Sequence, residues 1–144
     1  MLHEPLVLGI FEASLLHARA LGRRFGIVTT GAYWEGALSA GANALFGSAD
    51  AGGAFVGVRS TGLSALELHK MPAAEVHARI ALAAGALVGE DGAEVVIMGC
   101  AGMSGMEAAV REGARAVCRE VIVLDAVRCG VGMLEGILRA IGRV

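Results

Sequence analysis

The apolar run from Val95 to Met98 ends directly in a Gly-Cys-Ala-Gly turn, and this combination restricts the possible folds more than any other stretch of the chain. Four consecutive apolar residues are typical of a strand that is buried on both faces, as in a parallel sheet. Helical spacing of apolar residues resumes at Met106. The stretch therefore predicts a strand, a glycine-rich turn and a helix, with Cys100 at the carboxyl end of the strand.

This position makes Cys100 a candidate nucleophile or base. In open α/β sheets, ligands bind at the carboxyl edge of the strands, and a following helix directs its unpaired N–H groups and the positive end of its dipole to the same place. A thiolate is stabilised in such a setting. The alternative is an inert role, since free cysteine is among the residues most often buried in protein cores.

Short apolar runs alternate with helix-like segments along the whole chain. The expected strands are 6–10, 25–30, 54–59, 95–98 and 121–124. The expected helices are 11–21, 32–45, 64–69, 72–88, 104–116 and 126–141. Strands that are linked by helices through short loops form a parallel sheet with right-handed crossovers. The sequence thus predicts a three-layer, Rossmann-like α/β lobe, with a mostly parallel sheet of four to five strands flanked by helices.

Parallel strands end on the same side of a sheet, so the residues that follow the strands are expected to lie together. These residues are Thr30, Ser60, Cys100 and Asp125. Thr29, Thr30 and Gly31 also end a strand and open a helix, which makes them a candidate second corner for binding an anion. The alternative is that they are ordinary strand-end threonines and a turn glycine.

The composition narrows the classes of function. The 144 residues are expected to form one domain, and a net charge of -2 with mixed signs along the chain offers no footprint for nucleic acid or an anionic membrane. The three cysteines are widely spaced and show no zinc-like pattern, which predicts a reducing, cytoplasmic setting and no metal site. Although 56% of the residues are hydrophobic, no apolar stretch approaches about 18 residues, so neither a signal peptide nor a transmembrane helix is predicted.

Five short motifs carry a resemblance to a known family. They are Gly9–Ser14 (GIFEAS), Gly26–Gly31 (GIVTTG), Ser60–Leu63 (STGL), Gly99–Met103 (GCAGM) and Leu124–Val127 (LDAV). Together they resemble the aspartate/glutamate/hydantoin racemase superfamily, and most closely its hydantoin racemase branch with its fungal relatives. The similarity runs from about Pro5 to the C-terminus, and the Gly-Cys-Ala-Gly-Met motif is its most specific part.

The resemblance implies a cofactor-independent racemase that acts at the α-carbon of an amino acid or a 5-substituted hydantoin. Such enzymes use two cysteines on opposite faces of the substrate, one taking a proton as thiolate and the other delivering one as thiol. Cys100 matches the second cysteine, whereas the first would lie upstream of Pro5. Family members consist of two similar lobes, so residues 1–144 are interpreted as a single lobe with a closing C-terminal helix, without the N-terminal lobe.

The chemistry of proton abstraction assigns roles to several residues at this edge of the sheet. Removing a proton next to a carbonyl requires a base, with Cys100 as the candidate, and donors for the charge that develops on the carbonyl oxygen. The residues expected to bind the substrate are Ala101, Gly102 and Met103 through their backbone N–H groups, Thr29, Thr30, Gly31, Glu12 and Asp125. For Glu12 the alternative is an acid that only complements the dipole of the first helix.

The remaining reactive side chains carry less weight. Cys118 precedes the last strand and is interpreted as structural and buried, while Cys129 either approaches Cys100 or packs in the core. His69 and His77 occupy helix positions that look exposed, and both are interpreted as solvated side chains.

Two other classes of function stay open. A strand, a glycine-rich turn and a helix also describe a module that binds a small anion or a nucleotide, although glycines at 99, 102 and 105 do not match the dinucleotide fingerprint. Alternatively, the chain is a non-catalytic subunit of a larger complex or a homo-oligomer, because a lobe without its mate exposes an apolar patch.

Overall fold

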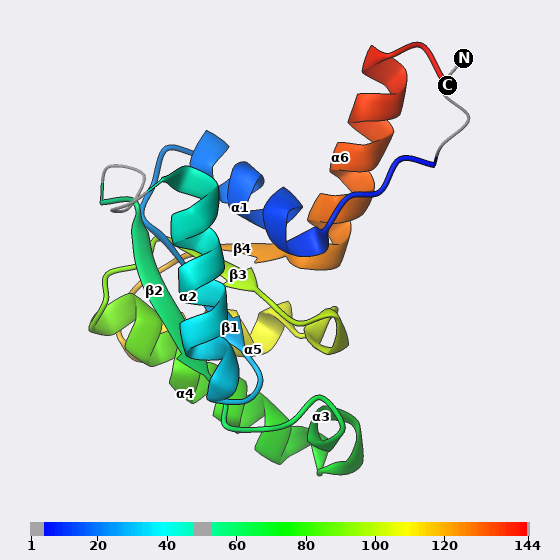
Figure 1. The fold of residues 1–144 in the computed structure, drawn as a ribbon. Helices are drawn as coiled ribbons and strands as arrows, with labels where there is room; N and C mark the ends of the chain where they lie inside the picture. Colours follow the sequence, from blue (N-terminus) through cyan, green and yellow to red (C-terminus); the bar gives the residue numbers. More distant parts are fainter. Residues whose placement is uncertain (1–4, 48–52, 144) are drawn as a thin grey trace.

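The computed structural model describes residues 5–47 and 53–143, in which helices and strands alternate (Figure 1). The strands are β1 Phe25–Thr29, β2 Phe55–Ser60, β3 Val95–Met98 and β4 Ile122–Asp125. The α-helices are α1 Ile10–Ala20, α2 Tyr33–Phe46, α3 Glu67–Lys70, α4 Ala73–Gly89, α5 Glu107–Ala116 and α6 Ala126–Ala140, and a short 3-10 helix, η2, covers Ala101–Met103. Most bounds agree with the expected elements to within a few residues; the N-terminal strand and the segment after Cys100 differ.

The four strands form one parallel sheet in the order β2-β1-β3-β4. The two central strands, β1 and β3, are buried along their whole length, which is the environment that their unbroken apolar runs predict. The edge strand β4 is more open, and Ile122 is 40% exposed. The predicted α/β lobe with a parallel sheet flanked by helices is confirmed.

The expected strand at residues 6–10 is wrong. Residues 5–9 have no regular secondary structure and run beside α6, and α1 already begins at Ile10 (Figure 1). Val7 is 91% exposed in this segment. An apolar run becomes a strand only where a neighbouring strand takes up its backbone hydrogen bonds, and this segment lies outside the sheet. Apolarity alone therefore does not predict a strand here.

Helices cover both faces of the sheet and bury two separate groups of apolar side chains (Figure 1). On one face lie α4 and α5, and all the expected core positions of α4 are buried: Val76, Ile80, Ala83, Ala84 and Leu87. On the other face α1 and α2 pack with the start of α6. Leu15 and Ala18 of α1 are buried there as expected, whereas Leu16 and Leu21 are exposed, so the buried stripe of α1 is narrower than predicted.

Glycines let α4 and α5 approach each other closely. A methyl group at Gly113 of α5 would overlap the backbone carbonyl oxygen of Ala81 and lie 2.8 Å from its carbonyl carbon. A methyl group at Gly85 of α4 would in turn lie 3.2 Å from the carbonyl oxygen of Gly113. Because backbone meets backbone at this crossing, Gly113 determines the spacing of the two helices that cover one face of the core.

The C-terminal half of α6 extends away from the sheet and from the helices that cover it (Figure 1). The sequence predicts packing positions on this helix at Met133, Leu134, Ile137, Leu138 and Ile141. None of them is buried, and Val131 on the same helix is 65% exposed. Among the described residues, the apolar side chains of this half of α6 thus stay at least partly exposed. Within the described parts of the chain, no helix is both long and apolar enough to cross a membrane.

Candidate active site

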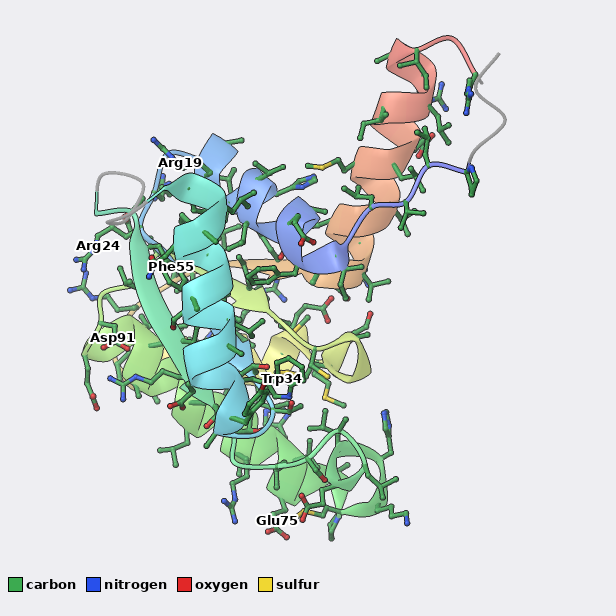
Figure 2. All side chains as sticks on the ribbon, in the orientation of Figure 1. Arg19, Arg24, Trp34, Phe55, Glu75 and Asp91 are labelled. Carbon is green, nitrogen blue, oxygen red and sulfur yellow. The ribbon has the colours of Figure 1, made fainter. Side chains whose placement is uncertain are left out.

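The carboxyl ends of the four strands meet at one edge of the sheet. The strand registers place four expected residues there: Thr30, Ser60, Cys100 and Asp125. The pairing of β1 with β3 continues beyond the strands, because the N–H group of Gly99 donates to the carbonyl oxygen of Val28 at 2.9 Å. Figure 2 shows Trp34, in the first turn of α2, at this end of the molecule. The predicted gathering of these residues at one edge is confirmed.

Cys100 is half-buried and marks the point where the chain leaves the sheet. Its backbone is still extended, with φ -121° and ψ 132°, and it precedes η2. Gly99 is required just before it, because a methyl group there would lie 2.5 Å from Cγ2 of Ile27. The close packing of β3 on β1 therefore holds Cys100 at the carboxyl edge.

The expected helix from about residue 104 is wrong at its start. Gly105 has φ +87°, a left-handed conformation that interrupts helical structure, and α5 begins only at Glu107. Only the short η2 helix follows Cys100 directly. A helix dipole acts within about the first turn, so the dipole of α5 does not account for a thiolate at Cys100. The helix that the nucleotide-binding alternative places after this turn likewise begins only at Glu107.

The backbone donors around the turn are fewer than expected. The N–H group of Met103 donates to the carbonyl oxygen of Cys100 at 2.9 Å, so it does not serve a substrate in this conformation. Ala101 and Gly102 open the 3-10 helix, and N–H groups at that position have no intrahelical acceptor. Two of the three expected backbone donors thus have no acceptor within the helix, and their role in substrate binding remains a prediction.

The corner formed by Thr29, Thr30 and Gly31 is more buried than an open anion site. Thr29 is 2% and Thr30 is 3% exposed, and their carbonyl oxygens accept hydrogen bonds from the N–H groups of Thr61 (2.9 Å) and Gly62 (3.2 Å). These bonds belong to the connection between β1 and the loop after β2. This burial agrees with the alternative interpretation, strand-end threonines and a turn glycine, and the expected role of the corner in substrate binding remains a prediction.

Sequence reasoning missed a carboxylate at this corner. Glu35, in the first turn of α2, accepts a hydrogen bond through Oε1 from the N–H group of Ser60 at 2.8 Å. The sequence shows that an acid lies early in a helix, where it complements the dipole. It does not show that this acid contacts the end of a strand far along the chain. A carboxylate at Ser60, which pairs with Thr29 at the end of β1, disfavours an anionic ligand at this corner.

Glu12 does not follow a strand, because the preceding segment is not part of the sheet. It lies exposed in the first turn of α1, where its carboxylate folds back against Gly9. The start of α1 packs against the start of α6, since a methyl group at Gly130 would lie 3.0 Å from Cγ2 of Ile10. The position of Glu12 agrees with the alternative interpretation, an acid that complements the helix dipole.

Asp125 is buried and bonded within the protein. Its carboxylate accepts hydrogen bonds from Oγ of Ser104 (2.5 Å) and from the N–H groups of Val127 (2.8 Å) and Arg128 (3.2 Å), which makes it the N-cap of α6. Burial by itself raises the pKa of Asp125, but these hydrogen bonds and the charge of Arg128 outweigh it and leave the pKa below its ordinary value. The carboxylate thus orients the turn after β3 and the start of α6, and its expected role in substrate binding remains a prediction.

We expect Asp125→Ala to lower the free energy of unfolding by about 1–2 kcal/mol near neutral pH, because the cap of α6 and the bond to Ser104 are lost. A carboxylate whose pKa is depressed by folding stabilises above its unfolded pKa, and this contribution is lost as the pH falls through the folded pKa. The difference between the proteins should therefore shrink below about pH 4. Urea unfolding at a series of pH values measures it; a difference that grows on acidification contradicts the assignment.

The other two cysteines differ in their surroundings. Cys118 is exposed, with a left-handed φ of 57° just after α5, so its expected burial is wrong. A left-handed residue of this kind ends a helix, and the sequence does not reveal where that end falls. Cys129 is buried, as the core interpretation predicts, and burial followed by the charge of Asp125 raises its pKa. Cys129 is therefore a poor candidate for a base.

A cleft of about 530 Å³ opens beside β4, lined by His17, Glu107, Arg111, Val123, Asp125, Arg128 and Cys129. Within it, Arg128 approaches Glu107 with 3.3 Å between Nη1 and Oε1. The charged side chains that line the cleft are thus already paired in part. Across residues 5–47 and 53–143, no group of three or more His, Cys, Asp or Glu side chains is arranged to hold a metal ion.

This architecture defines a class of protein: a Rossmann-like α/β lobe that carries a cysteine at the carboxyl edge of a central strand. The sequence profile of the Asp/Glu/Hydantoin racemase family matches residues 5–134. The chain therefore belongs to the Asp/Glu/hydantoin racemase family.

Two relatives are uncharacterized proteins of Schizosaccharomyces pombe. The first is 42% identical over 131 residues, which is 91% of this chain and 52% of that protein. The second is 32% identical over 147 aligned positions, which is 96% of this chain and 58% of that protein. The chain thus spans about half the length of the curated relatives it matches.

Two solved structures are similar in fold. Allantoin racemase from Pseudomonas fluorescens superposes with a TM-score of 0.76 at 27% identity, over 95% of this chain and 55% of that one. Allantoin racemase from Klebsiella pneumoniae gives a TM-score of 0.68 at 26% identity, over 94% of this chain and 51% of that one. In these comparisons too, the chain corresponds to about half of the longer protein.

Proposed function

We propose that this chain is one lobe of a cofactor-independent racemase and that Cys100 exchanges a proton with the α-carbon of the substrate. The observation that carries the proposal is the half-buried thiol at the carboxyl edge of β3, in a chain of the racemase family. The proton of the α-carbon passes to the thiolate sulfur and leaves a carbanion that is delocalised onto the neighbouring carbonyl oxygen. A proton returned to the carbon completes the cycle, so no oxidant or cofactor takes part.

The backbone next to Cys100 supplies donors for the charge on that oxygen. The N–H groups of Ala101 and Gly102 open η2 next to the sulfur, and preorganised donors of this kind stabilise a developing oxyanion. Removing one such donor from an enzyme costs about 10²–10³-fold in rate, so even two N–H groups contribute strongly. Both donors belong to the backbone, so a side-chain substitution does not remove them. Only a substitution at Gly102 tests them, and it does so indirectly.

A 5-substituted hydantoin fits the edge better than a free amino acid. The carboxylate of Glu35 at the neighbouring corner would repel the carboxylate of an amino acid, whereas the ring carbonyls of a hydantoin are neutral and need only donors. The structurally similar allantoin racemases act on a molecule of this class, since allantoin is a hydantoin with a ureido group at position 5. We therefore propose a hydantoin, rather than an amino acid, as the substrate class.

The second wall of the site is proposed to come from other polypeptide. Inversion of a stereocentre by two bases requires groups on opposite faces of the α-carbon, and residues on one edge of a single sheet reach one face only. The chain spans about half of its relatives, and α6 exposes apolar surface for a further lobe, a partner subunit or a second copy. On this view, residues 1–144 are a single lobe with its closing helix.

We expect residues 1–144 alone to exchange the α-proton of a 5-alkylhydantoin with solvent but to retain its configuration. The test incubates the purified chain with the L-hydantoin, and in parallel the L-amino acid, in D2O. Deuterium uptake is followed by NMR and optical rotation is followed separately, against a blank without protein. Uptake without loss of rotation is the expected result for the hydantoin.

Two outcomes contradict parts of this proposal. No uptake from either substrate above the blank would remove the catalytic role and leave a non-catalytic subunit. Loss of rotation that disappears in Cys100→Ser would show that the chain is a complete racemase by itself, for instance through a second copy, and would remove the single-wall argument.

A further inference from the structure

Strand β4 lies at one border of the sheet and, in the described parts of the chain, pairs with β3 alone. The N–H group of Ile122 donates to the carbonyl oxygen of Glu94 at 3.0 Å, so Ile122 faces β3. Because backbone groups alternate along a parallel strand, the N–H and C=O groups of Val123 and of Val121, just before the strand, face outward. The run from Val121 to Leu124 contains neither proline nor charge, which usually keep an exposed edge from pairing.

Two hollows lie along this outer edge. The cleft of about 530 Å³ reaches Val123, and a second hollow of about 250 Å³ lies next to Val121. Arg111 of α5 lines both of them. The hollows therefore follow one another along β4, on the side where a further strand would join the sheet.

Three arginines line the second hollow: Arg111 and Arg115 on α5, and Arg119 after it. All three are exposed, and across residues 5–47 and 53–143 none of them forms an ion pair. One carboxylate, that of Glu120, lines the same hollow. The hollow thus carries an excess of positive charge, although the whole chain has a net charge of -2.

The carboxylates of the adjoining cleft do not neutralise these arginines. Oδ2 of Asp125 accepts a hydrogen bond from Ser104, and Oε1 of Glu107 lies 3.3 Å from Nη1 of Arg128. Both carboxylates are therefore engaged by other side chains of the protein. The positive charge of the three arginines remains available to a ligand that lies along β4.

The spacing of the arginines matches that of an extended segment. Arg111 and Arg115 are four residues apart on a helix, which corresponds to about 6 Å along its axis. Side chains on one face of a strand recur about every 6.6–6.8 Å. Val121 and Val123 pack against the group of apolar side chains beneath α4 and α5. A strand added to β4 would therefore turn every second side chain toward the arginines of α5.

We propose that the outer edge of β4 binds an extended segment of another polypeptide, in which acidic side chains alternate with apolar ones. The segment forms backbone hydrogen bonds with Val123, and its acidic side chains bind Arg111, Arg115 and Arg119. Charge argues against a second copy of this chain, because antiparallel pairing of two β4 strands would place the arginines of both α5 helices side by side. The surface does not include Cys100, so this inference stands apart from the proposed racemase function.

The probe is a short fluorescein-labelled peptide of alternating glutamate and valine, whose binding to the intact chain is followed by fluorescence anisotropy. Two comparison peptides separate the contributions. Lysine replaces glutamate in the first, and every backbone nitrogen is methylated in the second, which keeps the charge but removes the backbone donors. We expect the glutamate–valine peptide to bind saturably and about 10-fold more tightly than either comparison peptide.

Two variants test the two kinds of contact, each with a matched control. Val123→Pro removes the outward N–H group without breaking the ladder to β3, and Val123→Ala keeps that group. Arg115→Glu reverses one charge of the hollow, and Arg19→Glu makes the same change at an exposed arginine of α1 that lines neither hollow. We expect Val123→Pro and Arg115→Glu each to weaken binding about 5-fold or more, and both controls to match the parent.

Absence of saturable binding would overturn the inference, as would equal affinity in the parent, Val123→Pro and Arg115→Glu. Equal binding of the N-methylated peptide, with full displacement by inorganic pyrophosphate, would show that the arginines hold an anion only. A dimer of the parent chain that Val123→Pro dissociates in sedimentation velocity would assign the edge to a second copy instead. Thermal unfolding checks each variant, and Arg115→Glu, an exposed substitution, decides if Val123→Pro does not fold.

Discussion

Cys100→Ser is expected to slow deuterium uptake at the α-carbon of the substrate by about 10²–10⁴-fold, the range that a positioned acid or base contributes. A serine hydroxyl has nearly the shape of the thiol but is a far weaker acid, so it is not available as an anion at neutral pH. The position of residue 100 at the carboxyl edge of β3 and its half-buried state motivate the prediction. NMR in D2O measures the exchange rate.

The matched control is Cys118→Ser, because Cys118 is exposed and lies between α5 and β4, at the amino end of that strand. It should exchange at the parent rate. Equal stability of both variants in urea unfolding would show that the loss belongs to the chemistry. Parental exchange in Cys100→Ser would contradict the assignment of the base, and an equal loss in Cys118→Ser would point to general damage.

Gly113→Ala is expected to be the most destabilising exchange of a single methyl group among the helix glycines discussed above, by about 1–3 kcal/mol or more. The new methyl group would overlap the backbone carbonyl oxygen of Ala81 in α4, and a backbone atom cannot move aside as a side chain can. The two helices would separate, and the core beneath them, which includes Leu87 and Val110, would lose contacts. Urea unfolding measures the change in free energy.

Gly36→Ala provides the control with the opposite sign. Gly36 lies within α2 and is exposed, and a methyl group there would meet nothing within 4 Å. We expect this exchange to raise the free energy of unfolding by about 0.5–1 kcal/mol, because alanine restricts the unfolded chain and favours helix. If both variants change stability in the same direction, the close approach of α4 and α5 does not determine the packing.

Local sequence rules predicted the fold correctly where the spacing of apolar residues matches the faces that are buried in the structure. Buried central strands have apolar residues on both faces, so Val95–Met98 and the strand from Phe25 could be placed without knowledge of their neighbours. The spacing of Val76 and Ile80 predicted the buried face of α4 in the same way. Leu6 and Val7 show the limit of this reasoning, since an apolar segment needs an adjacent strand before it can become one.

For the site, too, the sequence predicted positions but not the bonds that each side chain makes. That Cys100 lies at the carboxyl edge with Thr30, Ser60 and Asp125 follows from parallel strands and short crossovers, which connectivity alone imposes. What each group does there depends on bonds that span the chain. The carboxylate of Asp125 accepts hydrogen bonds from Ser104 and from the start of α6, and that of Glu35 accepts one from the N–H group of Ser60. A local sequence pattern predicts neither set of bonds.

By itself, then, the sequence determined the parallel α/β lobe and the place of one thiol on it, because apolar periodicity and connectivity act over a few residues at a time. The tertiary structure decided what surrounds that thiol. The left-handed Gly105 delays α5, and the buried Leu68 anchors α3 against η2, the short helix that follows Cys100. Loop conformation and helix docking arise from the balance of many distant contacts, which no single stretch of sequence encodes.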